Sequence, residues 1–156
     1  MEARFNFTDA EFGRQFFRKF GAAALSLYEA PLAKTVQELV KIRASQINSC
    51  AACTDMHTKD ALASGETQQR LNLVAVWREA TVFTEAERAA LALTEQGTRL
   101  ADTRGVDDTT WEAARKHFDD EELAALIALI AVINAFNRFN VIVRNPAGDY
   151  TPGQYA

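Results

Sequence analysis

Two cysteines and a histidine are the residues whose types and spacing could do chemistry. Cys50 and Cys53 are three positions apart, His57 follows four positions after Cys53, and the chain has no other cysteine. In a helix these positions lie on one face, one turn apart. A thiolate is the nucleophilic form of cysteine, and an imidazole one turn away can take the thiol proton. The pattern indicates a reactive dithiol.

The expected place of this pair is the N-terminus of a helix. There the positive end of the helix dipole lowers the pKa of a thiol. The dipole favours Cys50, which we expect to be nearer the helix start and more exposed, whereas His57 favours Cys53. We give His57 more weight, because a base can accept a proton and a dipole cannot. A disulfide is geometrically allowed, but its four-residue ring stabilises the fold by only about 2 kcal/mol, so a redox role is favoured.

Other interpretations of the pair are two small core residues beside a satisfied histidine, or a zinc site. A structural zinc site needs four ligands, and the second histidine, His117, belongs to a separate predicted helix. A thioredoxin-type domain needs βαβ units, and no strand pattern is present. We therefore expect neither a bound metal nor a bound cofactor.

Length and composition indicate one globular domain of residues 1–156 with an ordinary content of apolar (48%) and charged (24%) residues. The net charge of −4 gives no basic field for nucleic acid or an anionic membrane. The longest apolar run, 123–133, is shorter than the roughly 20 residues of a membrane span and predicts a buried helix. The N-terminus has no signal-peptide pattern, so we expect a cytoplasmic protein.

The elements that position the dithiol are predicted to be helices, since Ala, Leu, Glu, Arg and Gln dominate and strand alternation is poor. Thr8 with Glu11, and Thr84 with Glu87, have the spacing of capping boxes. Ser49 is a candidate N-cap for the helix that carries the dithiol. The predicted helices cover 8–20, 32–47, 50–64 (ended by Gly65), 66–77, 84–100, a short segment around Trp111, and 119–143 (opened by Asp119 and Glu122). Residues 145–156 are a turn-rich C-terminal arm.

The sequence resembles the AhpD-like alkylhydroperoxidases of the carboxymuconolactone decarboxylase superfamily. The family motif is a glutamate, eleven residues, and then C-x-x-C-x-x-x-H, which here are Glu38, Cys50, Cys53 and His57. The flanking segments, including LVKIRASQINSC, WREATVFTEAERAALALTE and VINAFNRFNV, are also similar, and the likeness covers about residues 21–144.

The resemblance implies an all-helical fold, with the CxxC at the N-terminus of a central helix, and a homo-oligomer, either trimer or hexamer. It implies a thiol-dependent peroxidase in which Cys53 attacks the hydroperoxide and Cys50 resolves the product. His57 and Glu38 would form the proton relay, although the helical periodicity alone makes Glu38 a solvated carboxylate. If Glu38 reaches His57, the two helices must form an antiparallel hairpin that turns at Asn48. An external dithiol, such as a dihydrolipoyl-bearing partner, would be the reductant.

One position departs from the family pattern. The best-studied peroxidase branch has a histidine just before the second cysteine, and this chain has Ala52. The loss of that proton shuttle would mean weaker peroxidase activity or a different reductant. Two other functions stay open beside the peroxidase, a non-peroxidase disulfide oxidoreductase and a redox-sensing oligomeric protein. A carboxymuconolactone decarboxylase is disfavoured, because that branch does not rely on the CxxC.

Two further groups of residues have open roles. An oligomer interface would use the many aromatic residues near the N-terminus, which are Phe5, Phe7, Phe12, Phe16, Phe17 and Phe20. The polar residues Asn134, Asn137, Arg138 and Asn140 could pair across subunits or line the site. Asp60 is a candidate surface acid that could orient His57 in place of Glu38.

Overall fold

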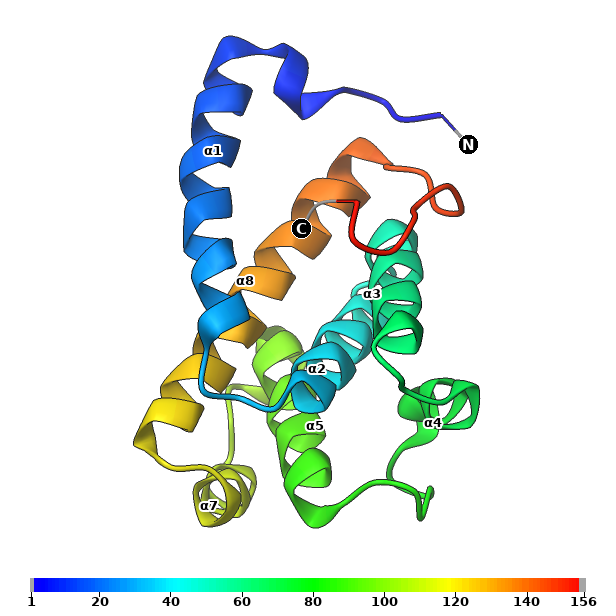
Figure 1. Ribbon diagram of the computed structural model, residues 1–156. Coiled ribbons are helices and arrows are strands. Elements are labelled where there is room, and N and C mark those ends of the chain that lie inside the picture. The colour runs from blue at the N-terminus through cyan, green and yellow to red at the C-terminus, as the bar shows by residue number, and fades with distance from the viewer. Residues whose placement is uncertain (1, 155–156) are drawn as a thin grey trace.

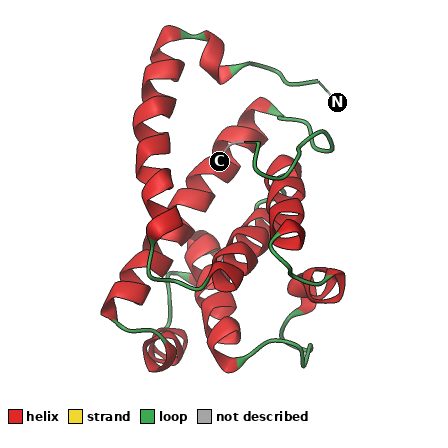
Figure 2. Cartoon of the chain, viewed as in Figure 1, coloured by secondary structure: helices red, strands yellow, loops and turns green. Residues whose placement is uncertain are grey.

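The computed structural model describes residues 2–154, and every regular element within that range is helical (Figures 1 and 2). The predicted all-α fold is therefore confirmed. The helices are α1 Glu11–Leu25, α2 Lys34–Ile47, α3 Ala51–Ala63, α4 Gln68–Leu73, α5 Glu85–Thr98, α6 Leu100–Thr103, α7 Asp108–His117 and α8 Asp120–Val143. Short 3₁₀ turns cover Phe7–Asp9, Ser26–Glu29 and Val74–Val76.

Several helix ends follow the sequence signals. Thr84 and Glu87 bond reciprocally at the start of α5, and Asp119 and Glu122 do the same at the start of α8. Each pair satisfies backbone N–H groups that the first helical turn leaves without an intrahelical partner. Gly65 follows α3 with a φ of 95°, a conformation in which glycine avoids the steric penalty of a side chain.

The predicted capping box at Thr8 and Glu11 is wrong. The amide and hydroxyl of Thr8 both donate to Asn6 Oδ1, so Asn6 caps a separate 3₁₀ turn. Helix α1 then begins after Ala10, without a side-chain cap. The predicted helix over 66–77 is also too long, because α4 ends at Leu73 and tightens into the 3₁₀ turn.

The core is organised around α2, which is buried on two sides. On one side Val36 and Val40 pack with side chains of α5, α7 and α8. On the other side Leu39 and Ile42 pack with side chains of the segment from α3 to α5. Packing on both sides fixes the rotation of α2 about its own axis, and Glu38 is held beside His57 of α3.

Helix α8 is long and apolar enough to cross a membrane by length and composition alone. Here Leu123, Leu126, Leu129 and Ile133 are all buried, and the first three belong to the core around α2. The predicted burial of the 123–133 segment is therefore confirmed on this face of the helix.

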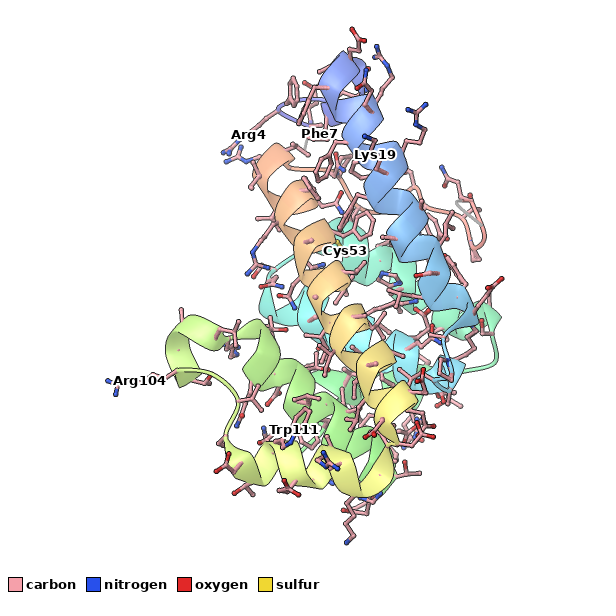
Figure 3. All side chains as sticks on the ribbon, turned by 90° about the vertical axis from the view of Figure 1, so that its left-hand side faces the viewer. Arg4, Phe7, Lys19, Cys53, Arg104 and Trp111 are labelled. Atoms are coloured by element: carbon pink, nitrogen blue, oxygen red, sulfur yellow. A yellow bond between two sulfur atoms is a disulfide. The ribbon has the colours of Figure 1, made fainter. Side chains whose placement is uncertain are left out.

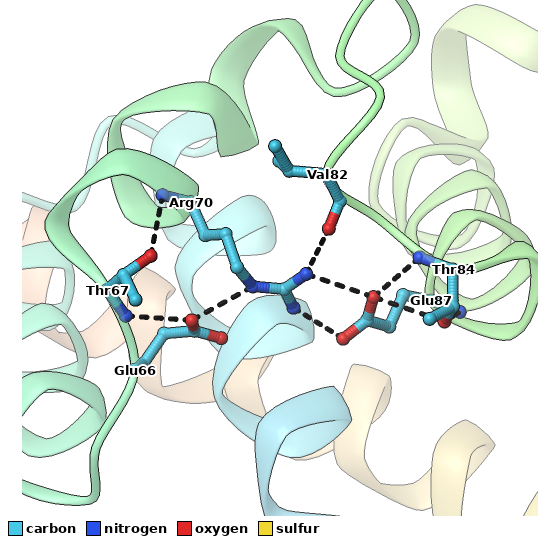
Figure 4. A network of polar contacts seen from close by, with 6 residues as sticks. All are labelled: Glu66, Thr67, Arg70, Val82, Thr84 and Glu87. Atoms are coloured by element: carbon cyan, nitrogen blue, oxygen red, sulfur yellow. Dashed lines mark hydrogen bonds and ion pairs between the residues drawn. The ribbon is translucent and has the colours of Figure 1, made fainter.

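A polar network fixes the loop between α4 and α5 (Figure 4). The Arg70 guanidinium bonds to Glu66 at 2.9 Å, to both carboxylate oxygens of Glu87, and to the carbonyl oxygen of Val82. Burial raises the pKa of Glu87, but the hydrogen bonds from Arg70 and Thr84 outweigh it, so the pKa lies below its ordinary value. The network ties the start of α5 to α4.

We predict that Arg70→Met lowers the free energy of unfolding by about 1–2 kcal/mol near neutral pH, as for a partly buried ion pair. The pKa of Glu87 is lower in the folded than in the unfolded state. The pair therefore stabilises the fold fully at pH values above the pKa that Glu87 has in the unfolded state. That stabilisation is lost as the pH falls through the pKa that Glu87 has in the folded state. Thermal denaturation measured from about pH 7 to about pH 3 should show the stabilities of wild type and Arg70→Met converging as the pH falls.

The matched control is Arg99→Met, which removes an exposed ion pair with Asp102 at 3.6 Å. It should change the free energy of unfolding by less than about 0.5 kcal/mol. A gap between wild type and Arg70→Met that stays constant over this pH range would contradict the assigned role of the Arg70–Glu87 pair.

Helix α1 lies along α8 and is joined to it by aromatic side chains (Figures 1 and 3). Phe7 lies between the two helices, and its ring centroid is 5.4 Å from that of Phe139. We call the aromatic residues that make these contacts the phenylalanine cluster: Phe7, Phe16, Phe17, Phe20, Phe136 and Phe139. Phe12 stacks at its edge and remains 73% exposed.

The C-terminal segment, residues 145–154, folds back onto α3. Lys59 Nζ donates to the carbonyl oxygens of Gly148 and Tyr150, at 2.8 and 2.9 Å. The Tyr150 hydroxyl donates to Asp60 at 2.8 Å. Burial and this hydrogen bond raise the pKa of Tyr150 to about 12, so the hydroxyl keeps its proton near neutral pH.

Candidate active site

The two cysteines begin α3 and are joined by a disulfide with a Cα–Cα distance of 5.4 Å. Cys50 is the N-cap residue, and its sulfur accepts the backbone N–H of Cys53 at 3.3 Å. The predicted cap at Ser49 is wrong, because Ser49 adopts a φ of 56° in the turn between α2 and α3. The expected greater exposure of Cys50 is also wrong, since Cys50 and Cys53 are 2% and 1% exposed.

Polar side chains of α8 hold the turn that precedes the cysteines. Asn48 Nδ2 donates to Asn134 Oδ1 and to Asn137 Oδ1, both at 2.9 Å. Asn137 in turn donates to Ser45 Oγ at 3.0 Å. These bonds fix the α2–α3 turn, in which a non-glycine residue takes a left-handed conformation that costs roughly 1–2 kcal/mol. The two asparagines thus act within one chain, behind the dithiol.

Glu38 and His57 meet across the hairpin of α2 and α3, as the resemblance implied. Glu38 Oε2 lies 3.1 Å from His57 Nδ1, and Glu38 Oε1 accepts a hydrogen bond from Lys41 Nζ at 2.7 Å. Burial raises the pKa of Glu38, but His57 and Lys41 together outweigh it and lower the pKa below its ordinary value. An ionised Glu38 fixes the proton of His57 on Nδ1, and Nε2 is then the nitrogen that can accept a proton.

The prediction of Glu38 as a solvated carboxylate, which came from periodicity alone, is wrong. The side chain is 17% exposed and is enclosed by Lys41 and His57. Asp60 does not replace it, because the Asp60 carboxylate accepts the Tyr150 hydroxyl. Among residues 2–154, no group of three or more His, Cys, Asp or Glu side chains is placed to hold a metal ion.

A cavity of about 950 Å³ lies in front of the dithiol. Cys53 and His57 are among its lining residues, and within the described chain Cys50 is not. Side chains of α1 and α8 and the C-terminal segment form the other walls, with Phe17, Phe136 and Phe139 supplying aromatic surface. The cavity is therefore largely apolar, and of the two cysteines only Cys53 lines it.

Asn140 reaches the dithiol from α8, on the side where Figure 3 shows Cys53 close behind that helix. Its Nδ2 lies 3.3 Å from Cys53 Sγ. From the sequence alone, the asparagines of α8 could either pair across subunits or line the site. Asn140 lines the cavity, whereas Asn134 and Asn137 bond behind it.

Comparisons with known proteins identify the family of the chain. Residues 11–96 match the carboxymuconolactone decarboxylase family. The uncharacterized protein YdfG of Bacillus subtilis is 40% identical over 99 residues, which are 64% of this chain and 67% of YdfG. The uncharacterized protein YnjA of Escherichia coli is 33% identical over 101 residues, which are 63% of this chain and 54% of YnjA, so the match spans only about half of that relative.

A solved structure extends the likeness to nearly the whole chain. The crystal structure of ATU0492 from Agrobacterium tumefaciens, a protein of unknown function named as an antioxidant defence protein AhpD, superposes with a TM-score of 0.90 at 36% identity. The match covers 96% of this chain and 100% of ATU0492. With its helical fold and its CxxC at the start of α3, the chain belongs to the carboxymuconolactone decarboxylase family and has the AhpD-like fold.

Proposed function

We propose that the protein is a thiol-dependent peroxidase that reduces organic hydroperoxides. The observation that carries the proposal is the asymmetry of the dithiol: Cys53 lines the cavity, and Cys50 sits behind it within disulfide distance. A peroxide in the cavity would meet Cys53 first, and Cys50 could then attack the oxidised sulfur from behind. The apolar walls favour an organic hydroperoxide over hydrogen peroxide.

The proposed cycle begins when His57 Nε2 takes the proton of the Cys53 thiol while Glu38 holds the ring through Nδ1. The thiolate attacks the terminal oxygen of ROOH and the O–O bond breaks. Cys53 becomes a sulfenic acid, and RO⁻ takes the proton from His57 and leaves as ROH. The Cys50 thiol then attacks the sulfenic sulfur, and the disulfide forms as water leaves. An external dithiol supplies two electrons and two protons by thiol–disulfide exchange and restores both thiols.

The proposal includes the setting in which this cycle would run. Dithiols are available in the cytoplasm, where we place the protein, and a dihydrolipoyl group on a partner protein is the expected reductant. We propose a trimer or hexamer in which the exposed apolar side chains of α1, including Phe12, are covered by another subunit. Ala52 lies at the cavity in place of the second histidine of the best-studied branch, so His57 would be the proton carrier at the sulfur.

The test is peroxide consumption by the purified, reduced protein with dihydrolipoamide as the donor. We expect turnover, and a higher kcat/KM for cumene hydroperoxide than for hydrogen peroxide. Absence of turnover with both peroxides would overturn the peroxidase function. If the disulfide still exchanged rapidly with dihydrolipoamide, the result would favour a disulfide oxidoreductase or redox sensor.

A further inference from the structure

We propose that Asn140 is a catalytic residue that stabilises the thiolate of Cys53 by a hydrogen bond from its side-chain amide. The role rests on the proposed function of Cys53 as the attacking thiol. Asn140 lies 87 positions from Cys53 in the sequence, and the packing of α8 beside α3 brings its Nδ2 to 3.3 Å from Cys53 Sγ. Neither the CxxC nor the histidine that follows it signals this contact.

The orientation of the Asn140 amide is determined by its other partners. The carbonyl oxygen of Phe136 can only accept a hydrogen bond, and it lies 3.1 Å from Asn140 Nδ2. On the other side, Asn145 Nδ2 donates to Asn140 Oδ1. The oxygen of the Asn140 amide is therefore turned away from the sulfur, and one N–H of Nδ2 is directed at Cys53.

The environment of Cys53 makes such a donor chemically important. Cys53 is 1% exposed, so its sulfur has little access to water, and burial disfavours the charged form of a thiol. A hydrogen bond to a charged acceptor is roughly twice as strong as one between neutral groups. Asn140 therefore contributes more to the reduced, ionised site than to the disulfide. When the Cys53 thiol ionises, its proton passes to His57 or to water. Asn140 donates a hydrogen bond to the thiolate and does not lose a proton itself.

Other charged and titratable groups also face this space, and their effects must be separated from that of Asn140. Those that line the cavity are Arg18 on α1, Tyr28, Lys41 on α2, Asp55 and His57 on α3, and Asp149 and Tyr150 in the C-terminal segment. Glu38 stands behind His57. None of them changes when Asn140 is replaced, so a difference between variants reports on the amide.

The experiment measures the rate of alkylation of Cys53 by iodoacetamide as a function of pH. The background is full-length Cys50→Ser, in which Cys53 is the sole thiol and serine is itself a good N-cap. Asn140→Leu removes the donor with a side chain of similar size that favours helix. Asn140→Asp keeps the shape, places an acceptor beside the sulfur, and maintains the test if the leucine variant does not fold.

We expect the midpoint of the alkylation profile to rise by about one pH unit in Asn140→Leu and by more in Asn140→Asp. The thiolate fraction below both midpoints then falls about tenfold, while the intrinsic reactivity of the more basic thiolate rises about threefold. Alkylation in Asn140→Leu should thus be about threefold slower at low pH and about threefold faster at high pH than in the parent. The two rate profiles should cross.

A loss of packing alone would change accessibility in the same direction at every pH, so parallel profiles without a shifted midpoint would overturn the proposal. An unchanged profile in both variants would overturn it as well. These outcomes are separate from the peroxidase test: crossing profiles together with no peroxide turnover would reject the peroxidase function and retain the role of Asn140 at the thiolate.

Discussion

Cys53→Ser is expected to abolish peroxide turnover, with a fall in kcat of at least about 10³-fold, because a serine hydroxyl is not ionised near neutral pH and cannot reduce a peroxide. Of the two cysteines in the chain, Cys53 lines the cavity and Cys50 does not, so Cys50 is not placed to replace it. The measurement is the consumption of cumene hydroperoxide with dihydrolipoamide, for wild type and variant side by side.

The matched control is Cys50→Ser, which makes the same replacement of sulfur by oxygen at the cysteine that does not line the cavity. It should remove multiple turnover with the dithiol but retain the first reaction with peroxide. If Cys53→Ser kept the wild-type rate, or if Cys50→Ser lost the first reaction while Cys53→Ser retained it, the assignment of the two sulfurs would be reversed or wrong.

His57→Gln is expected to slow the first oxidation of Cys53 by about 10²-fold or more, the usual contribution of a positioned general base. Glutamine keeps a polar side chain at this place but cannot take the thiol proton. Glu38→Gln should slow the same step by about tenfold. Glutamine keeps a hydrogen-bond acceptor for His57 Nδ1 but removes the charge that orients and stabilises the protonated ring. Both rates are measured by stopped-flow mixing of the reduced variants with a single addition of peroxide.

The double variant tests whether the two residues act as one unit. Since Glu38 has contact with His57 and acts through it, Glu38→Gln should add little once His57 is glutamine. Two losses that multiply in the double variant would show independent roles and would contradict the relay. Asp60→Asn is the control at a neighbouring acid of α3, because Asp60 bonds Tyr150 instead of His57.

Much of the fold and the centre of the site could be predicted because the signals are local. The capping boxes at Thr84 and Asp119 depend on contacts three residues apart, and both helices begin where these signals lie. The placement of Cys50, Cys53 and His57 on one face of a helix follows from the helical repeat alone. The hairpin of α2 and α3 followed from the requirement that Glu38 reach His57, which the resemblance supplied and periodicity did not.

The features that sequence reasoning missed depend on contacts between distant segments. The left-handed Ser49 is compatible with the fold because Asn134 and Asn137 of α8 hold the adjacent Asn48. Equal burial of the two cysteines results from the packing of the hairpin against α8. The approach of Asn140 to Cys53 requires the rotation of α8 in the core, and no short-range pattern encodes that rotation.

The most direct test of the central claim, that Cys53 is the sulfur that takes the peroxide oxygen, is to trap that oxygen. Reduced Cys50→Ser and Cys53→Ser are each treated with one equivalent of cumene hydroperoxide in the presence of dimedone, and peptides are analysed by mass spectrometry. We predict one dimedone adduct, at Cys53, in Cys50→Ser and none in Cys53→Ser, because a sulfenic acid without its resolving thiol persists long enough to react. An adduct at Cys50 in Cys53→Ser, with Cys53 unmodified in the other variant, would contradict the claim.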